Sequence, residues 1–130
     1  MTLARRLALA ALGAPFVVLG YGAAADPGGR VALAADLGIP APEATVRFNG
    51  AAMVAGGVGL VTGVLPRASA LGLAVSMVPT TLAGHAFWKQ QDPGLRTTNR
   101  IHFFKNLGLV GGLLAVAMTA SDRPRTGGCR

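Results

Sequence analysis

Few side chains in this sequence can take part in chemistry, and His85 is the most informative of them. It is the only ionisable residue well inside a long apolar stretch, with Thr81 four residues before it and Trp88 three residues after it. In a continuous helix this spacing places the three side chains on one face. An imidazole among apolar residues can donate to a carbonyl oxygen, carry a proton or bind a metal. Beside aromatic rings, it would suit an apolar ligand that bears a carbonyl group.

Three further polar residues are candidates for the same ligand site. Asn49 and Asn106 open the second and fourth apolar stretches, and Tyr21 lies near the end of the first. An asparagine at a helix start can cap the free amides of the first turn, and the pattern favours this interpretation. If the two asparagines are buried deeper, they would instead orient a ligand from facing helices.

A purely structural interpretation accounts for the same residues and is favoured over a ligand site. His85 would then hydrogen-bond a neighbouring helix, and the aromatic residues would form an interfacial belt. A bound quinone or lipid-like ligand ranks second, and proton or substrate passage third. We expect no metal site, because His102 is the only other histidine, is predicted to lie in a loop, and no carboxylate lies in an apolar stretch.

The elements that must position these residues are four apolar stretches of 17 to 20 residues. At about 1.5 Å per residue, each helix would be roughly 25–30 Å long, enough to cross a bilayer. The sequence therefore predicts an all-α, four-transmembrane-helix bundle that forms a single domain over residues 1–130, with a polar tail at 121–130. The predicted spans are Leu7–Ala25, Phe48–Leu65, Ala68–Phe87 and Phe104–Ala120.

Composition supports a membrane protein and excludes two other classes. Apolar residues make up 52% of the chain and charged residues 13%. The net charge of +7 does not indicate nucleic-acid binding, because the arginines lie at span ends and no basic stripe alternates with aromatics. Cys129 is the only cysteine, which excludes a disulfide or CxxC redox pair within one chain.

This topology gathers the polar candidates at one end of the bundle, where span 1 leads into span 2 and span 3 into span 4. Six of the seven aromatic residues belong to the same end. The opposite end offers arginines, Pro66 and small residues. We therefore expect a site at the first end and plain membrane contacts at the second. The aromatic residues at the first end are Tyr21, Phe48, Phe87, Trp88, Phe103 and Phe104.

The basic residues outside the spans are candidate contacts for lipid or protein. Residues Trp88–Phe103 are predicted to be a basic loop that could meet anionic lipid or an acidic partner. Positive charges are distributed six against six over the two sides, but Arg5 and Arg6 flank the first span, so both termini are predicted to be cytoplasmic. The candidate interface residues are Arg67, Arg96, Arg100 and Lys105.

Small residues predict how the spans pack. In span 3 a ridge of small side chains recurs every four positions, and Gly59/Gly63 and Gly108/Gly112 repeat this spacing in spans 2 and 4. Such ridges let helix backbones approach closely. Pro79 should free the carbonyl of Val75, with two hydroxyls of the ridge nearby to satisfy it. The ridge consists of Ala68, Gly72, Ser76, Thr80 and Gly84.

The chain resembles the DoxX family of small four-helix membrane proteins through the order and spacing of several short motifs from about Leu7 to Ala120. No single motif is specific, but their joint order is. The matching landmarks include Asn49, Gly50, Arg67, His85, Trp88, Lys105 and Asn106. The motifs are Gly20 to Asp26-Pro27, Leu37-Gly38-Ile39-Pro40, Phe48-Asn49-Gly50, Pro66-Arg67, Gly84-His85-Ala86-Phe87-Trp88, Asp92-Pro93, Phe104-Lys105-Asn106-Leu107 and Gly111-Gly112-Leu113-Leu114.

The resemblance implies a multi-pass plasma-membrane protein whose first span is retained, although Arg5-Arg6 and Ala23-Ala24-Ala25 would also fit a signal peptide. Some relatives are linked to quinone reduction, and others to complexes that handle oxidative and thiol stress with soluble redox proteins. The resemblance transfers no catalytic residue. We therefore expect a non-catalytic membrane component of a redox or oxidative-stress complex that contacts the bilayer. The alternatives are a quinone-interacting subunit of an oxidoreductase, and a small transporter or channel that works as an oligomer.

Overall fold

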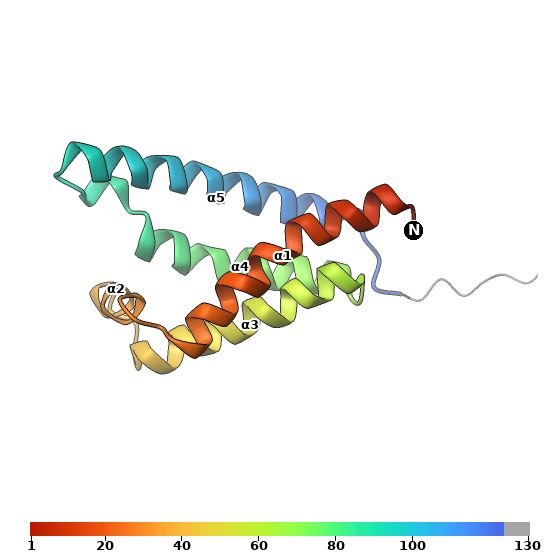
Figure 1. The fold of residues 1–130 in the computed structure, drawn as a ribbon, viewed down its shortest axis with the longest axis horizontal. Helices are drawn as coiled ribbons and strands as arrows, with labels where there is room; N and C mark the ends of the chain where they lie inside the picture. The colour runs from red at the N-terminus through yellow and green to blue at the C-terminus, as the bar shows by residue number, and fades with distance from the viewer. Residues whose placement is uncertain (124–130) are drawn as a thin grey trace, which may run out of the picture.

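The computed structural model describes residues 1–123, which form helices and no strands. Four long helices form a bundle, and a short helix crosses one end of it (Figure 1). Of the predicted polar tail, only residues 121–123 lie within this range. In chain order the elements are α1 (Leu3–Ala25), α2 (Arg30–Asp36), α3 (Pro42–Thr62), α4 (Pro66–Gly84), a single 3₁₀ turn η1 (Phe87–Lys89) and α5 (Pro93–Thr119).

The four long helices of the described chain are long and apolar enough to cross a membrane; the third such segment, Pro66–Lys89, joins α4 and η1. Large apolar side chains cover the outside of the bundle: Val18, Phe48, Val75 and Met118 are each at least 69% exposed. Water-soluble monomers rarely expose continuous apolar surface of this kind, whereas lipid tails accommodate it. The predicted all-α bundle of four spans is therefore confirmed, and the chain is a multi-pass membrane protein.

The last span begins well before its predicted start, so the predicted loop Trp88–Phe103 is wrong. This segment contains η1 and then the first turns of α5. The Asp92 carboxylate accepts a hydrogen bond from the Leu95 amide at 2.9 Å, and Pro93 has the backbone angle of a first helical residue. With 27 residues, α5 is about 40 Å long and exceeds a hydrocarbon core of about 30 Å. The hydropathy pattern detected only its apolar part.

The hairpin between α3 and α4 is short, and a residue that follows α5, Asp122, caps the start of α4. Gly63 ends α3 in the left-handed conformation, with φ 73°, which glycine adopts without strain. At the start of α4, the Asp122 carboxylate accepts hydrogen bonds from the amides of Arg67 at 2.8 Å and Ala68 at 3.1 Å. A carboxylate stabilises a helix N-terminus, so Asp122 fastens the segment after α5 to this hairpin.

The closest helix contact is between α1 and α3, not along the small-residue ridge predicted for span 3. A Cβ atom added to Gly20 would lie 2.6 Å from the carbonyl oxygen of Gly50, and one added to Gly13 would lie 2.7 Å from that of Gly57. These two pairs let the backbones touch. By contrast, a Cβ on Gly72, a member of the predicted ridge, would meet nothing within 4 Å.

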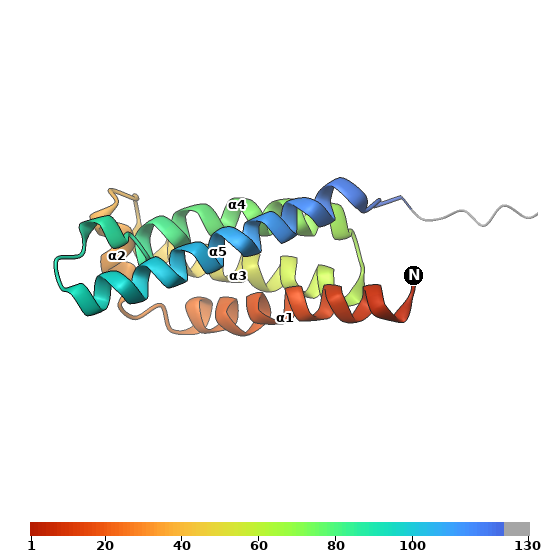
Figure 2. The same cartoon turned by 90° about the horizontal axis from the view of Figure 1, so that it is seen from above.

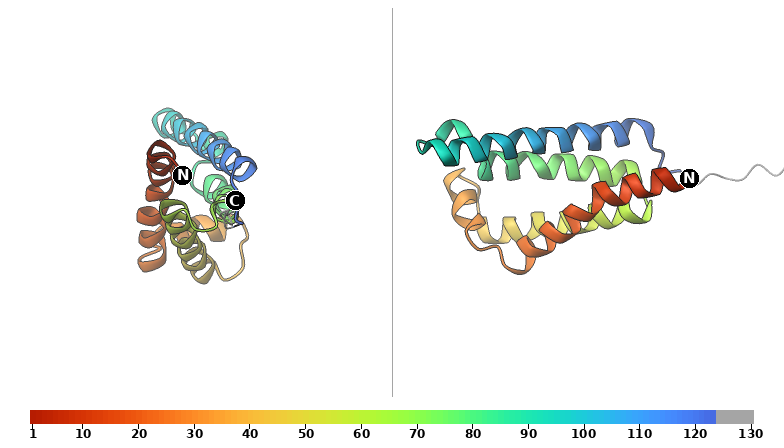
Figure 3. Two further views of the ribbon diagram at one scale, coloured as in Figure 1. Left: turned by 90° about the vertical axis from the view of Figure 1, so that its right-hand side faces the viewer. Right: turned by 45° about the horizontal axis from the view of Figure 1, so that its top comes forward.

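All four long helices contribute side chains to one buried core. Leu60 of α3, Leu73 of α4 and Leu113 of α5 are fully buried, and Phe16 of α1 is 2% exposed. The helices lie nearly parallel when the bundle is viewed from above (Figure 2). The N-terminus and the end of α5 lie at the same end of the bundle, while α2 and η1 lie at the other (Figure 3). The predicted site residues can therefore meet only at the end where α2 lies.

Candidate functional site

His85 lies where α4 ends, not within a continuous helix face. Its amide donates to the Thr81 carbonyl at 2.9 Å, but its own backbone (φ −133°, ψ 33°) is no longer helical. Trp88 follows in η1, after this change of direction, and is 48% exposed. The prediction that Thr81, His85 and Trp88 share one helix face is therefore wrong for Trp88.

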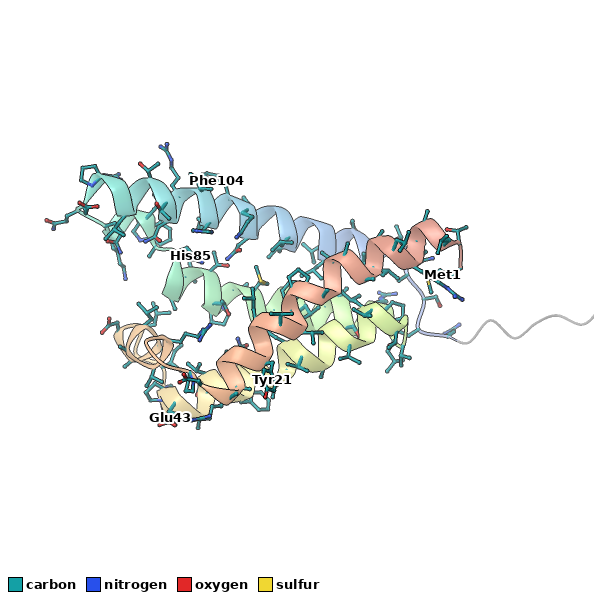
Figure 4. All side chains as sticks on the ribbon, viewed as in Figure 1. Met1, Tyr21, Glu43, His85 and Phe104 are labelled. Carbon is teal, nitrogen blue, oxygen red and sulfur yellow. The ribbon has the colours of Figure 1, made fainter. Side chains whose placement is uncertain are left out.

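The nearest functional partner of His85 is His102, which the sequence had assigned to a loop. His102 lies in α5, and its ring stacks on that of His85 with centroids 5.0 Å apart and planes 27° apart. The Lys105 ammonium lies 3.1 Å from Nδ1 of His102, one helical turn along α5. The Nδ1 atom of His85 is buried and has no hydrogen-bond partner among residues 1–123. Two imidazoles and an ammonium therefore gather at the α4–α5 end, near the His85 label in Figure 4.

Four of the aromatic residues pack into one cluster, and two of them, Phe87 and Phe103, lie within two positions of His85 and His102 in the sequence. The Phe87 ring lies 5.3 Å from that of Trp88 and 5.5 Å from that of Phe103, both edge to face. Phe103 also contacts Phe104, with centroids 5.6 Å apart. Such pairs prefer edge-to-face geometry, which stabilises the junction between η1 and α5.

Tyr21 and Phe48 do not join the aromatic cluster. Tyr21, labelled in Figure 4, is 69% exposed on α1, and Phe48 is 76% exposed on α3. The topology brings these residues to the same end of the bundle, but the rotation of α1 and α3 turns both rings outward. The structure therefore places Tyr21 apart from His85.

Asn49 is a link between helices, and its predicted role as a helix cap is wrong. It lies two turns inside α3, which begins at Pro42. Its Oδ1 accepts from the Ser76 hydroxyl at 2.7 Å, and its Nδ2 donates to the Thr80 hydroxyl at 3.2 Å. The Thr80 hydroxyl donates in turn to the Ser76 carbonyl at 3.0 Å, so the ridge hydroxyls serve this network rather than the carbonyl of Val75. This closed network fixes α3 against α4.

Asn106 plays the same part between α4 and α5, and its predicted role as a cap is also wrong. Its side chain is buried at 8% exposure and donates to the Thr81 hydroxyl at 3.1 Å. The cap of α5 is Asp92, far earlier in the chain. Both asparagines have committed amide groups to neighbouring helices, which leaves the histidine pair as the principal polar group of this end.

The four candidate interface residues divide between the two ends of the bundle. Arg96 and Arg100 lie on exposed turns of α5 rather than in a loop, and Lys105 follows on the same helix. Arg67 lies at the opposite end, in the first turn of α4. Within residues 1–123 the one ion pair joins Arg47 to Glu43, so none of these four side chains is neutralised there by a carboxylate.

Sequence reasoning missed the role of Arg47. Its Nη1 atom donates to the carbonyls of Ala24 at 2.7 Å and Ala25 at 3.0 Å, while Glu43 holds the guanidinium from within α3. The last carbonyls of a helix lack partners within the helix, and an arginine satisfies them well. Sequence carries no mark of this contact, because it joins residues more than twenty positions apart.

The site offers hydrogen-bond donors and aromatic surface but no metal cluster. Within residues 1–123, no three His, Cys, Asp or Glu side chains come together as metal ligands. For a quinone, the groups available here are the imidazoles of His85 and His102, with the rings of Phe87 and Phe103 close by. An imidazole nitrogen can hydrogen-bond a carbonyl oxygen, and this is the chemistry that the histidine pair offers.

Comparison with known proteins agrees with the fold. The DoxX family model matches residues 2–86, which include α1 to α4 and His85. The match ends before α5, so it does not cover the landmarks Lys105 and Asn106. No curated protein and no solved structure shows significant similarity to the chain. Because the family model covers well over half of its 130 residues, the chain belongs to the DoxX family.

Proposed function

We propose that this protein is a non-catalytic membrane component of a redox or oxidative-stress complex in the plasma membrane. Family membership supports a small multi-pass membrane protein, and the resemblance to relatives that work in such complexes supports the redox assignment. Both termini are cytoplasmic in this proposal, because Arg5 and Arg6 flank the first span. The end bearing His85 then faces away from the cytoplasm.

The observation that carries the proposal is the surface at the start of α5. Here Arg96 and Arg100 are exposed alongside Leu95 (56% exposed) and Ile101 (62% exposed), and Asp92 is committed to its cap. Arginine with large apolar side chains is the composition of protein interfaces. The turns extend beyond the apolar part of the span, where a soluble partner with an acidic surface can reach them. We therefore assign the docking of a soluble redox protein to this surface.

The experiment is purification from native membranes in a mild detergent, followed by mass spectrometry of all proteins that co-purify. The double variant Arg96→Gln/Arg100→Gln should lose the soluble partner while the bundle remains intact. Arg67→Gln/Arg123→Gln is the matched control, since it removes the same charge from exposed positions at the opposite end. Loss of the partner only in the control would move docking to the other end, and retention in both variants would refute the scaffold.

A second candidate function, a subunit that contacts quinone, is favoured by the Nδ1 atom of His85, for which the described part of the chain supplies no hydrogen-bond partner. This atom is buried in a ring that stacks on His102, and it would hydrogen-bond a quinone carbonyl. The variant His85→Phe keeps an aromatic ring against His102 but removes the hydrogen-bonding atom. It should abolish retention of quinone in the purified protein, whereas Tyr21→Phe, on the outward face of α1, should not. Equal quinone content in His85→Phe and the unmodified protein would exclude this function.

A further inference from the structure

A cleft on the other side of the α4 terminus has no role in the function proposed above. It lies between α2 and the end of α4 with η1 and has a volume of about 210 Å³. Leu33 and Leu37 line it from α2, and Leu82 lines it from α4. The cleft also contains one acidic and one basic side chain, Asp36 and Lys89. Two elements that are far apart in the sequence thus build one amphipathic cavity.

The two charges in the cleft do not neutralise each other. Asp36 and Lys89 are both exposed, and the one ion pair within residues 1–123 is between Arg47 and Glu43. A carboxylate and an ammonium that share a cavity without pairing can each receive a group of opposite charge. A ligand that carries both a cation and an anion therefore matches this cleft better than a ligand with a single charge.

The position of the cleft indicates that this ligand comes from the membrane. The cleft is lined by α2 and by the last residues of the span segment Pro66–Lys89. In Figure 1, α2 and the end of α4 lie at the same end of the bundle. Leu33 and Leu37 remain 41% and 38% exposed, which suits a short helix that lies at the interface. A volume of about 210 Å³ is below the range of about 300–1,000 Å³ for sites that enclose a drug-sized molecule. The cleft thus has room for a headgroup whose acyl chains remain outside.

We propose that this cleft binds the headgroup of a zwitterionic phospholipid with a primary amine, that is, phosphatidylethanolamine. The Lys89 ammonium receives the phosphate, and the Asp36 carboxylate receives the lipid ammonium. The leucines contact the start of the acyl chains. An anionic lipid would leave Asp36 facing a like charge, and a choline headgroup has no N–H to donate to the carboxylate. Phosphatidylethanolamine satisfies both charges.

The test is native mass spectrometry of the protein equilibrated in mixed micelles with equal amounts of phosphatidylethanolamine, phosphatidylcholine and phosphatidylglycerol. We expect ethanolamine lipid to be retained preferentially. Because an exposed ion pair contributes at most about 1 kcal/mol, Asp36→Asn and Lys89→Gln should each reduce its retention up to about fivefold. Lys89→Arg keeps the positive charge and should retain the lipid.

A matched control comes from the same end of the bundle. Asp26→Asn removes the same negative charge as Asp36→Asn from an exposed residue outside the cleft and should leave lipid retention unchanged. Equal retention of all three lipids, or a preference for phosphatidylglycerol, would overturn the proposal. So would displacement of the lipid by water-soluble glycerophosphoethanolamine at equal concentration, which would indicate a soluble ligand. Docking of the soluble partner depends on Arg96 and Arg100, which lie outside the cleft. A failure of the docking proposal can therefore be told apart from a failure of the lipid proposal.

Discussion

Replacing Asn49 with alanine tests whether the polar network between α3 and α4 holds the bundle together. The variant loses two hydrogen bonds between helices, to the hydroxyls of Ser76 and Thr80. Hydrogen bonds between transmembrane helices contribute about 0.6 kcal/mol on average and at most about 1.7 kcal/mol, so we expect a loss of about 1.2 kcal/mol, with a ceiling near 3 kcal/mol. The Ser76 hydroxyl, which stays buried, can turn to a carbonyl of its own helix, so no lasting unpaired group adds to this cost.

The assay is reversible unfolding in mixed micelles with increasing dodecyl sulfate, followed by the fluorescence of Trp88. This residue is the only tryptophan of the chain and packs against Phe87 and Phe103 at the α4–α5 junction, so its emission reports whether that junction is intact. Thr119→Val is the control, because its hydroxyl bonds only to carbonyls of α5 itself. We expect the control to change the free energy of unfolding by less than about 0.5 kcal/mol.

A double-mutant cycle separates the hydrogen bond from general packing effects. Combining Asn49→Ala with Thr80→Val should give a coupling energy of about 0.6 kcal/mol, because the two side chains bond to each other. A loss below about 0.3 kcal/mol for Asn49→Ala, within the usual error of additivity, would refute the reasoning. If the effects of Asn49→Ala and Thr80→Val on the free energy of unfolding simply add, the proposed hydrogen bond between these two side chains would be refuted.

Two further predictions concern helix packing and capping, and both use the same unfolding assay. Gly20→Ala should destabilise the protein by about 1–3 kcal/mol, because the new Cβ would meet the Gly50 carbonyl at 2.6 Å. The control Gly22→Ala should not destabilise it, because a Cβ there would meet nothing within 4 Å. Equal effects of the two substitutions would contradict the close α1–α3 contact. Asp122→Ala should lower the free energy of unfolding by about 0.5–2 kcal/mol, because it removes the cap of α4. Asp26 is an exposed acidic residue at the other end of the bundle, and Asp26→Ala should lower this free energy by less. A neutral result for Asp122→Ala would mean that water caps α4 equally well.

The position of the candidate site along the chain was predictable, but its composition was not. Hydropathy located the polar end of the bundle and singled out His85, because the cost of placing an ionisable group in an apolar stretch depends only on local sequence. His102 was missed as a partner because the polar first turns of α5 show no apolar pattern. Only when Asp92 and Pro93 start the helix early does His102 come to stack on His85.

The same distinction applies to the asparagines. Both asparagines stand at the start of an apolar stretch, where a helix-capping residue is expected. Whether a residue caps a helix depends on where that helix begins. Because α3 begins at Pro42 and α5 at Pro93, both Asn49 and Asn106 lie inside helices and bond to a neighbouring helix. An earlier helix start, by about two turns in α3 and about three turns in α5, therefore changed the role of each residue from a local contact to a tertiary one.

By itself, the sequence determined the number of spans, the all-α class and the end of the bundle where polar and aromatic residues gather. Span length and hydropathy are properties of neighbouring residues, and an even number of spans sets which chain ends share a side. Only the tertiary structure decided which faces meet: a Cβ on Gly20 would meet the Gly50 carbonyl, one on Gly72 would meet nothing within 4 Å, and Tyr21 faces outward. The physical reason is that a helix apolar on all sides carries no mark of its rotation, which is fixed only when its partners pack against it.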